Sequence, residues 1–328
     1  MKRTSLIVIA LLVVLVLGDR LAGAVLSTMV MKSANRFAAL YNDAGPVDVL
    51  VLGNSRADLH FSPKMIRDQA GQSARNLGLG GISTVLAEAL LLDHLDAYGP
   101  PKVLIIEPSN IITDPGKVGD MRLFATWSDR IGQLVRADTP EFYWAGRLSS
   151  LFNYNTDMFV RVLNDLRARP AERLTRAAMP ANLLADLRAA PPEQRERLVI
   201  RDENLLALDR ILKLARDQGI NAHVVMTPYL PEFFRGHPDA AHWKSAITAR
   251  ATATGTPVHD LTGLIDDPAL FRCLPSIAAP CAFVALVGRG ETPMAERLGH
   301  APTEEIVDQM LAYAVGGLEA VGRWHRER

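Results

Sequence analysis

Polar residues that could carry out chemistry follow directly after strand-like runs of apolar residues. The run at 47–52 is short, rich in valine and leucine, and is followed by Gly53, Asn54, Ser55 and Arg56. A glycine permits a sharp turn, so the serine hydroxyl would project above the edge of a sheet, close to the start of a helix. This is a suitable position for a serine nucleophile, although a serine or asparagine after a strand can also serve only as a helix N-cap.

Two further strand ends carry groups that can donate hydrogen bonds to an oxyanion. The segment 76–81 contains three glycines, among them Gly81, and glycine lets a backbone amide approach a bound anion closely. The run at 102–107 is followed by Asn110, whose side-chain amide is a hydrogen-bond donor. In an open α/β sheet, functional groups gather at the carboxyl ends of the strands. Each segment alone is also consistent with a simple turn or an Asx-turn.

Taken together and in order, the three segments resemble a known family. Strand–Gly-Asn-Ser, then Asn-x-Gly-x-x-Gly, then a strand end that carries asparagine is similar to the first three sequence blocks of the SGNH/GDSL hydrolase superfamily. The resemblance covers 47–112 and extends over 200–265. It implies that Ser55 is the nucleophile and that the amides of Ser55 and Gly81 form an oxyanion hole with the side chain of Asn110. One such donor lowers a reaction barrier by roughly 3–4 kcal/mol.

The first and third blocks depart from the family pattern. Asn54 stands where the family usually has aspartate, and Asn110 lacks the usual glycine before it. With Arg56 after the serine, the first block is closer to the exported, polysaccharide-modifying branches, including the alginate O-acetyltransferase-like proteins, than to secreted lipases. The resemblance therefore implies an acyl enzyme of polysaccharides more than a lipase.

The general base is the part of the pattern that the sequence does not supply. The family's last block, Asp-x-x-His before the final helix, does not occur here in that form. His300 directly precedes a predicted amphipathic helix and is our candidate base, with Glu296 four residues before it; His259 is a second candidate. Because 272–299 fits the family poorly between two flanks that fit, a local change of reading frame is another interpretation, and sequencing this stretch of DNA would decide it.

The other histidines predict no further site. His60 is expected on a helix face, His223 inside a strand, and His237 and His242 in a loop and a helix. Their spacings match no metal-ligand set. The glycines at 78–81 do not have the spacing of a dinucleotide loop. We therefore expect neither a metal nor a cofactor.

Strands and helices alternate along the chain. Strand-like runs occur at 47–52, 102–107, 221–227 and 256–261, and helical periodicity at 84–98 and 199–218. This alternation predicts a parallel sheet covered by helices in a three-layer α/β/α arrangement, SGNH-like or flavodoxin-like. We expect one such domain over 32–328, with a helical insertion at about 119–198 that is rich in arginine, alanine and leucine.

The first 31 residues form a separate apolar segment. Lys2 and Arg3 precede an uncharged run at 5–18, and a second apolar run follows Asp19 and Arg20. The segment is either a transmembrane signal anchor, held by the positive-inside rule, or a signal peptide cleaved near an Ala-x-Ala site at 22–24. Both interpretations predict that the rest of the chain is periplasmic or otherwise outside the cytoplasm, and we favour the anchor.

The overall charge and the cysteines narrow the range of partners. Lysine plus arginine and aspartate plus glutamate both number 36, so the formal charge is zero and nucleic-acid binding is not expected. Cys273 and Cys281 fit no zinc or redox motif, and in an exported chain they could be bridged or free.

Two functions are consistent with these patterns. The first is a membrane-tethered serine esterase or acyltransferase that acts on acyl esters, probably in the sense of acetyl groups, of an envelope or secreted polysaccharide, with an acylated carbohydrate or small ester as partner. The second is a catalytically inactive relative that binds glycan or acts as a scaffold in polysaccharide export, which the missing Asp-x-x-His favours. An ester-hydrolysis assay distinguishes them.

Overall fold

The computed structural model describes residues 2–33, 35–116, 118–155, 162–163, 166, 185–186, 188–195, 197–264, 271–272 and 284–285. The chain divides into two compact units. Unit 1 comprises residues 1–45, 92–97 and 116–171, and unit 2 comprises 46–91, 98–115 and 172–328. The candidate chemistry lies in unit 2.

A parallel sheet of five strands forms the centre of unit 2, in the order β2-β1-β3-β4-β5. The strands are β1 (Val49–Leu52), β2 (Ala74–Asn76), β3 (Val103–Ile106), β4 (Asn221–Met226) and β5 (Val258–Asp260). All four pairings are parallel, and every residue of β1 and β3 is buried, as expected for strands covered on both faces. The predicted parallel α/β sheet is confirmed, and its strand order is the flavodoxin-like one.

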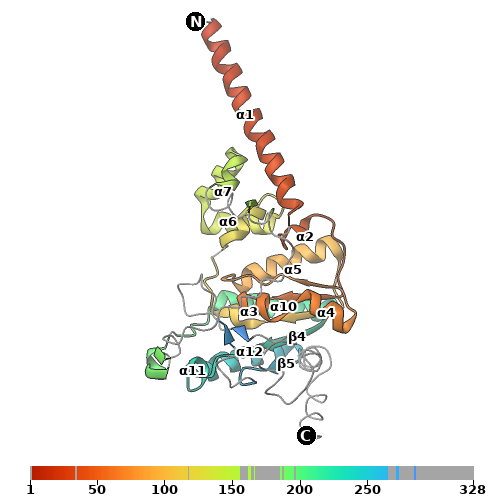
Figure 1. Cartoon of the computed structure of the whole chain (residues 1–328), viewed down its shortest axis with the longest axis vertical. Helices are drawn as coiled ribbons and strands as arrows, with labels where there is room; N and C mark the ends of the chain where they lie inside the picture. Colours follow the sequence, from red (N-terminus) through yellow and green to blue (C-terminus); the bar gives the residue numbers. More distant parts are fainter. Residues whose placement is uncertain are drawn as a thin grey trace. The chain divides into compact units, whose positions relative to one another are not determined.

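Helices cover the sheet. On one face, Ala57 and Phe61 of the α3 segment (Ser55–His60) and Ile66 of α4 (Pro63–Ala70) pack against Val49, Val51 and other residues of the strands. The longer connections are α5 (Thr84–Tyr98), α10 (Asp202–Asp217) and α12 (Ala240–Thr254), and α10 and α12 contact each other and the strands β4 and β5. Figure 1 shows α12 and the short α11 (Pro231–Phe234) next to β5.

The remaining described elements of unit 2 are short. The 3-10 helices η1 (Pro108–Ile112) and η4 (Pro192–Gln194) belong to it, and β6 (Phe271–Arg272) and β7 (Val284–Ala285) form an antiparallel pair. Helix α5 has the bounds that its periodicity predicts, 84–98, and α10 begins three residues later than the predicted 199.

Unit 1 is helical in its described residues. It contains α1 (Lys2–Met31), α2 (Ala38–Tyr41), η2 (Gly119–Phe124), α6 (Asp129–Asp138), α7 (Pro140–Leu148) and η3 (Leu151–Tyr154). Figure 1 shows α1 as one continuous helix with α6 and α7 next to it. The aromatic residues of this unit pack on one another: the rings of Tyr41 and Phe124 are stacked with centroids 5.6 Å apart. The described part of the predicted insertion at 119–198 thus has helices and no strand.

The N-terminal helix is apolar over most of its length. Residues Arg3–Met31 have a mean hydropathy of 2.4, and the helix is long and apolar enough to cross a membrane. This is the helix expected for the first 31 residues, and its composition fits an anchor as well as a signal sequence.

Candidate active site

Three loops meet at the carboxyl edge of the sheet. Val51 pairs with Asn76 and Leu52 pairs with Ile106, so the ends of β2, β1 and β3 lie side by side. The loop after β2 contacts the loop after β1, because the amide of Leu79 donates to the carbonyl of Gly53 at 3.3 Å. The loops after β1 and β3 also contact each other, since Ser109 Oγ lies 3.0 Å from Asn54 Oδ1. The structure therefore brings the three segments that the sequence singles out to one edge of the sheet.

Gly53 makes the sharp turn after β1 possible. Its φ is +144°, and a Cβ placed there would lie 2.7 Å from both the Ala57 Cβ and the Glu107 carbonyl oxygen. A side chain at this position would therefore collide with backbone and with the first turn of α3. Asn54 follows as the N-cap, and its Oδ1 accepts a hydrogen bond from the amide of Arg56 at 2.9 Å. The N-cap role that the sequence left open for this segment thus belongs to Asn54, and Ser55 is the first helical residue.

Ser55 keeps its hydroxyl available. The residue is 7% exposed, and among the described residues Oγ has no hydrogen-bond partner. Gly80, in the loop after β2, is close to it: a Cβ at Gly80 would lie 3.7 Å from the Ser55 Cβ. Gly81 has a φ of +78° and is exposed. The role of the Gly81 amide in an oxyanion hole stays a prediction.

Asn110 is oriented by its neighbours. It is buried, and its Oδ1 accepts a hydrogen bond from Thr84 Oγ1 at 3.0 Å. The buried Asn204 donates from Nδ2 to the carbonyl of Asn110 and accepts at Oδ1 from the amide of Thr84. With its oxygen engaged by Thr84, the side chain of Asn110 can offer its NH₂ group to an anion. This is the polarity that the predicted oxyanion role requires.

Asn76 holds the loop after β2 against α3. Its Nδ2 donates to the carbonyls of Ala57 and Phe61, both at 2.7 Å, and its Oδ1 accepts from the amide of Gly78. A Cβ at Gly78 would lie 2.6 Å from the amide nitrogen of Asp58, so only glycine allows this close approach. Asn76 and Gly78 position the glycine loop rather than supply reacting groups.

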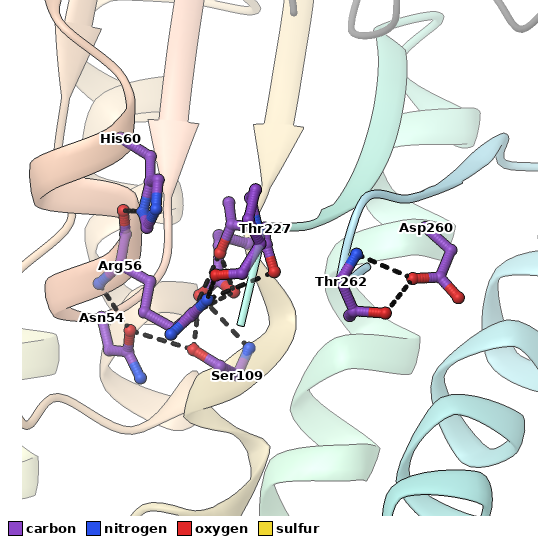
Figure 2. Close-up of polar contacts among 9 residues, drawn as sticks. Asn54, Arg56, His60, Ser109, Thr227, Asp260 and Thr262 are labelled. Carbon is purple, nitrogen blue, oxygen red and sulfur yellow. Dashed lines mark hydrogen bonds and ion pairs between the residues drawn. The ribbon is translucent and has the colours of Figure 1, made fainter. Parts of the chain in front are cut away.

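A buried ion pair beneath the loops was not predicted from the sequence. Arg56 Nε lies 3.6 Å from Glu107 Oε1 and donates to Thr227 Oγ1 at 2.9 Å, and the guanidinium also donates to the Thr227 and Pro228 carbonyls. Arg56 and Glu107 are 4% and 0% exposed. Figure 2 shows Arg56 between Thr227 and Ser109, so the ends of β1, β3 and β4 are joined by one network.

The same network sets the electrostatics of Glu107. Burial raises the pKa of its carboxyl, and the charge of Arg56 and the hydrogen bonds of Ser109 and Thr227 lower it without fully offsetting the burial. Ser109 Oγ lies 2.5 Å from Glu107 Oε2. The Arg56 guanidinium stacks on the Tyr229 ring at 3.7 Å from its centroid. An acidic residue directly after β3 and an arginine directly after Ser55 were the available sequence signals for this pair.

A cavity opens beside this network at the ends of β4 and β5. It has a volume of about 520 Å³ and is lined by Tyr229, Phe234, Lys244, Asp260 and Thr262, among others. Burial raises the pKa of Asp260, but the hydrogen bonds from Lys244 and Thr262 outweigh it, so the net pKa lies below the ordinary value. Figure 2 shows Asp260 accepting both hydrogen bonds of Thr262. The cavity therefore combines aromatic walls with a cation and an anion.

His60 and His259 are engaged away from Ser55. The ring of His60 lies with Nδ1 2.7 Å from the carbonyl oxygen of Arg56, and burial lowers its pKa to about 3. His259 Nε2 lies 3.1 Å from Nδ1 of His223 on the neighbouring strand. The structure therefore joins His259, the second candidate base, to His223 and shows no contact with Ser55. His300, Glu296, Cys273 and Cys281 lie outside the described residues.

The His223–His259 pair predicts a pH-dependent stability. Burial, and then the neighbouring His223, lower the pKa of His259 from 6.5 to about 4. Between these values the unfolded chain binds a proton that the folded chain does not, so stability is full above about pH 6.5 and falls towards pH 4. We expect His259→Asn to flatten this slope in thermal melts recorded from pH 4 to pH 7. His242→Asn, at an exposed position, is the control, and equal slopes for His259→Asn and wild type would contradict the prediction.

No protein-family model matches the sequence, and no curated protein matches it. Two solved structures are similar in fold. One is described as a "putative acylhydrolase" from Bacteroides fragilis NCTC 9343, with 10% identity and a TM-score of 0.34 over 80% of this chain and 87% of that one. The other is a GDSL-like lipase from Bacteroides thetaiotaomicron VPI-5482, with 11% identity and a TM-score of 0.35 over 84% and 98% of the two chains. These are similarities of fold, and the chemistry has to follow from the residues of this chain.

Proposed function

We propose that this protein is a serine enzyme that acts on acyl esters. The observation that carries the proposal is the place of Ser55: its hydroxyl has no partner among the described residues, at the point where the loops after β1, β2 and β3 meet. A serine that only caps a helix would use its hydroxyl on a backbone amide, and here Asn54 has that role. The hydroxyl of Ser55 is therefore available for another use.

The reaction would proceed through an acyl-enzyme. Ser55 Oγ attacks the ester carbonyl and gives its proton to a base, the tetrahedral oxyanion collapses, and the alcohol leaves with a proton. Asn110 Nδ2 and backbone amides of the Ser55 and glycine loops would stabilise the oxyanion. Water then releases the acyl group in an esterase, or a sugar hydroxyl accepts it in an acyltransferase. We assign the base to His300, by its place before the C-terminal helix predicted from the sequence.

For the substrate we propose an acetylated or otherwise acylated polysaccharide of the envelope or a secreted one. Two features support this choice. Helix α1 would tether the chain to a membrane with unit 2 on the extracytoplasmic side, where such polymers are found. The cavity of about 520 Å³ has stacked aromatic rings in its wall, with Tyr229 and Phe234 centroids 4.4 Å apart, beside the charged groups of Lys244 and Asp260. Aromatic and polar groups together suit the faces and hydroxyls of a sugar ring.

Hydrolysis of p-nitrophenyl acetate by the full-length protein in detergent tests the proposal. We expect turnover above the spontaneous rate and a covalent acetyl group on Ser55 in intact-mass spectra after rapid quenching. A rate equal to that of buffer would favour the second function, a non-catalytic glycan-binding or scaffold protein. That alternative has one observation on its side, because no described histidine contacts the hydroxyl of Ser55.

The oxyanion role of Asn110 gives a separate prediction. Asn110→Ala is expected to lower kcat by about 10²–10³-fold with little change in KM, because the lost hydrogen bond forms chiefly in the transition state. Thr84→Val removes the partner that orients Asn110 Oδ1 and should lower kcat by less. Asn221→Ala, at the exposed amino end of β4, is the matched control. If Asn110→Ala raises KM and leaves kcat unchanged, Asn110 binds substrate and is not an oxyanion donor.

A further inference from the structure

The exposed apolar surface of α1 extends past its two internal charges. Large apolar side chains are exposed from Leu6 (65%) to Leu17 (63%), and the exposure continues at Leu21 (70%) and Val25 (53%). At 1.5 Å per residue the helix from Leu6 to Val25 is about 30 Å long, which is the thickness of the hydrocarbon core of a bilayer. Asp19 and Arg20 then lie about 8 Å inside one boundary of that core.

A segment of α7 and η3 engages both charges. Asp19 accepts hydrogen bonds from Ser149 Oγ at 2.5 Å and from the amides of Ser150 and Leu151 at 2.7 and 3.2 Å. Arg20 donates to Ser150 Oγ at 2.8 Å and to the carbonyls of Arg147 and Leu148 at 3.1 and 3.2 Å. Every one of these partners comes from residues 147–151. In hydrocarbon, charged groups require partners of this kind.

Two glycines allow the segment to approach α1 closely. A Cβ at Gly23 would lie 2.3 Å from the Ser150 Cβ, and a Cβ at Gly146 would lie 2.1 Å from Asn153 Oδ1. The first glycine lets α1 contact the segment, and the second lets α7 contact η3. Small residues of this kind are typical of helix contacts within membranes.

The same segment exposes large apolar side chains. Trp144 is 53% exposed, Leu148 is 81% exposed and Leu151 is 42% exposed. Trp144 and Leu148 are four residues apart on α7, so they lie on one face of the helix. The guanidiniums of Arg136 and Arg147 lie over the rings of Trp144 and Tyr143, at 5.5 and 4.8 Å from the centroids. Tryptophan next to arginine is the composition of a membrane–water interface.

We propose that residues 144–151, here called the tip, form a second membrane contact that inserts beside α1 and separates Asp19 and Arg20 from lipid. The occupant of the exposed face is the bilayer itself: Trp144, Leu148 and Leu151 contact acyl chains, and Arg136 and Arg147 reach the headgroups. The depth of about 8 Å agrees with that of interfacial helices. This inference rests on the proposed tethering through α1 and is independent of the chemistry at Ser55.

Fluorescence quenching in vesicles tests the proposal. In the full-length chain with Cys273 and Cys281 changed to alanine, single cysteines replace Leu12 on α1, Leu148 or Trp144 on the tip, and Leu206, and each carries an environment-sensitive fluorophore. The protein is reconstituted in phosphatidylcholine–phosphatidylglycerol vesicles with spin-labelled acyl chains. We expect labels at 12, 144 and 148 to be quenched roughly twofold or more, as for groups at acyl depth. Leu206 is the matched control because it is also 53% exposed but belongs to α10 of unit 2.

The outcomes separate the inference from the tethering. If the label at 12 is quenched while those at 144 and 148 match the label at 206, the tip does not insert and the inference is wrong. If the label at 12 is not quenched, α1 does not span the bilayer, and both the tethering and the inference fail.

Discussion

Replacing Ser55 by alanine is expected to lower the rate of p-nitrophenyl acetate hydrolysis by about 10⁴-fold or more, because the loss of a nucleophile removes the acyl-enzyme pathway altogether. The fold should be unaffected, since the Ser55 hydroxyl has no hydrogen-bond partner among the described residues. The measurement is the initial rate of p-nitrophenolate release by full-length wild type and variant at equal concentrations. Intact-mass spectra should show the acetyl adduct in wild type only.

The matched control for this experiment is Ser245→Ala. Ser245 is an exposed serine of α12 in the same unit, so its loss should leave the rate unchanged. An active Ser55→Ala variant would sink the nucleophile assignment, and the hydrolysis would then have to be traced to another residue. Equal loss in both serine variants would point to an unstable preparation and would equally remove support for Ser55.

The second large effect is expected in stability, at Arg56. Arg56→Met should lower the free energy of unfolding by about 3–5 kcal/mol, because it leaves the carboxylate of Glu107 buried without its charge partner. The change is an increase in cavity and polarity cost at the centre of the sheet edge, not a loss of surface charge. It can be measured by urea unfolding of the detergent-solubilised protein, followed by tryptophan fluorescence. Trp243, fully buried and 5.8 Å from the Tyr229 ring that stacks on Arg56, is a nearby reporter.

A double-mutant cycle with Glu107→Gln separates the pair from its surroundings. The double variant should lose clearly less stability than the sum of the two single variants, because each single variant leaves the other partner unpaired. Arg216→Met is the control, since the Arg216–Asp217 pair is about half exposed and should contribute at most about 1 kcal/mol. Additive losses, or a cost at Arg56 no larger than at Arg216, would show that the buried pair does not support the fold.

These two residues also show how far the sequence alone reaches. The strand β1 and the turn at Gly53 were predictable because apolar, β-branched residues closed by glycine are a local pattern. The strand β2 was visible only through the asparagine and glycines at its end, because Ala-Arg-Asn has no strand signature and is held in place by pairing with β1. The predicted helix at 84–98 matched the structure because its periodicity spans four turns.

What the sequence determined by itself is therefore what neighbouring residues encode: the apolar helix α1, the main strands and helices, and the three polar segments that follow strands. What only the tertiary structure decided are the partners of these groups. Arg56 and Thr227 are 171 residues apart, Asp19 and Ser149 are 130 apart, and His223 and His259 meet across two strands. The physical reason is that a local pattern reports which face of an element is apolar, whereas a buried charge or amide needs a specific partner that only chain folding brings within hydrogen-bond distance.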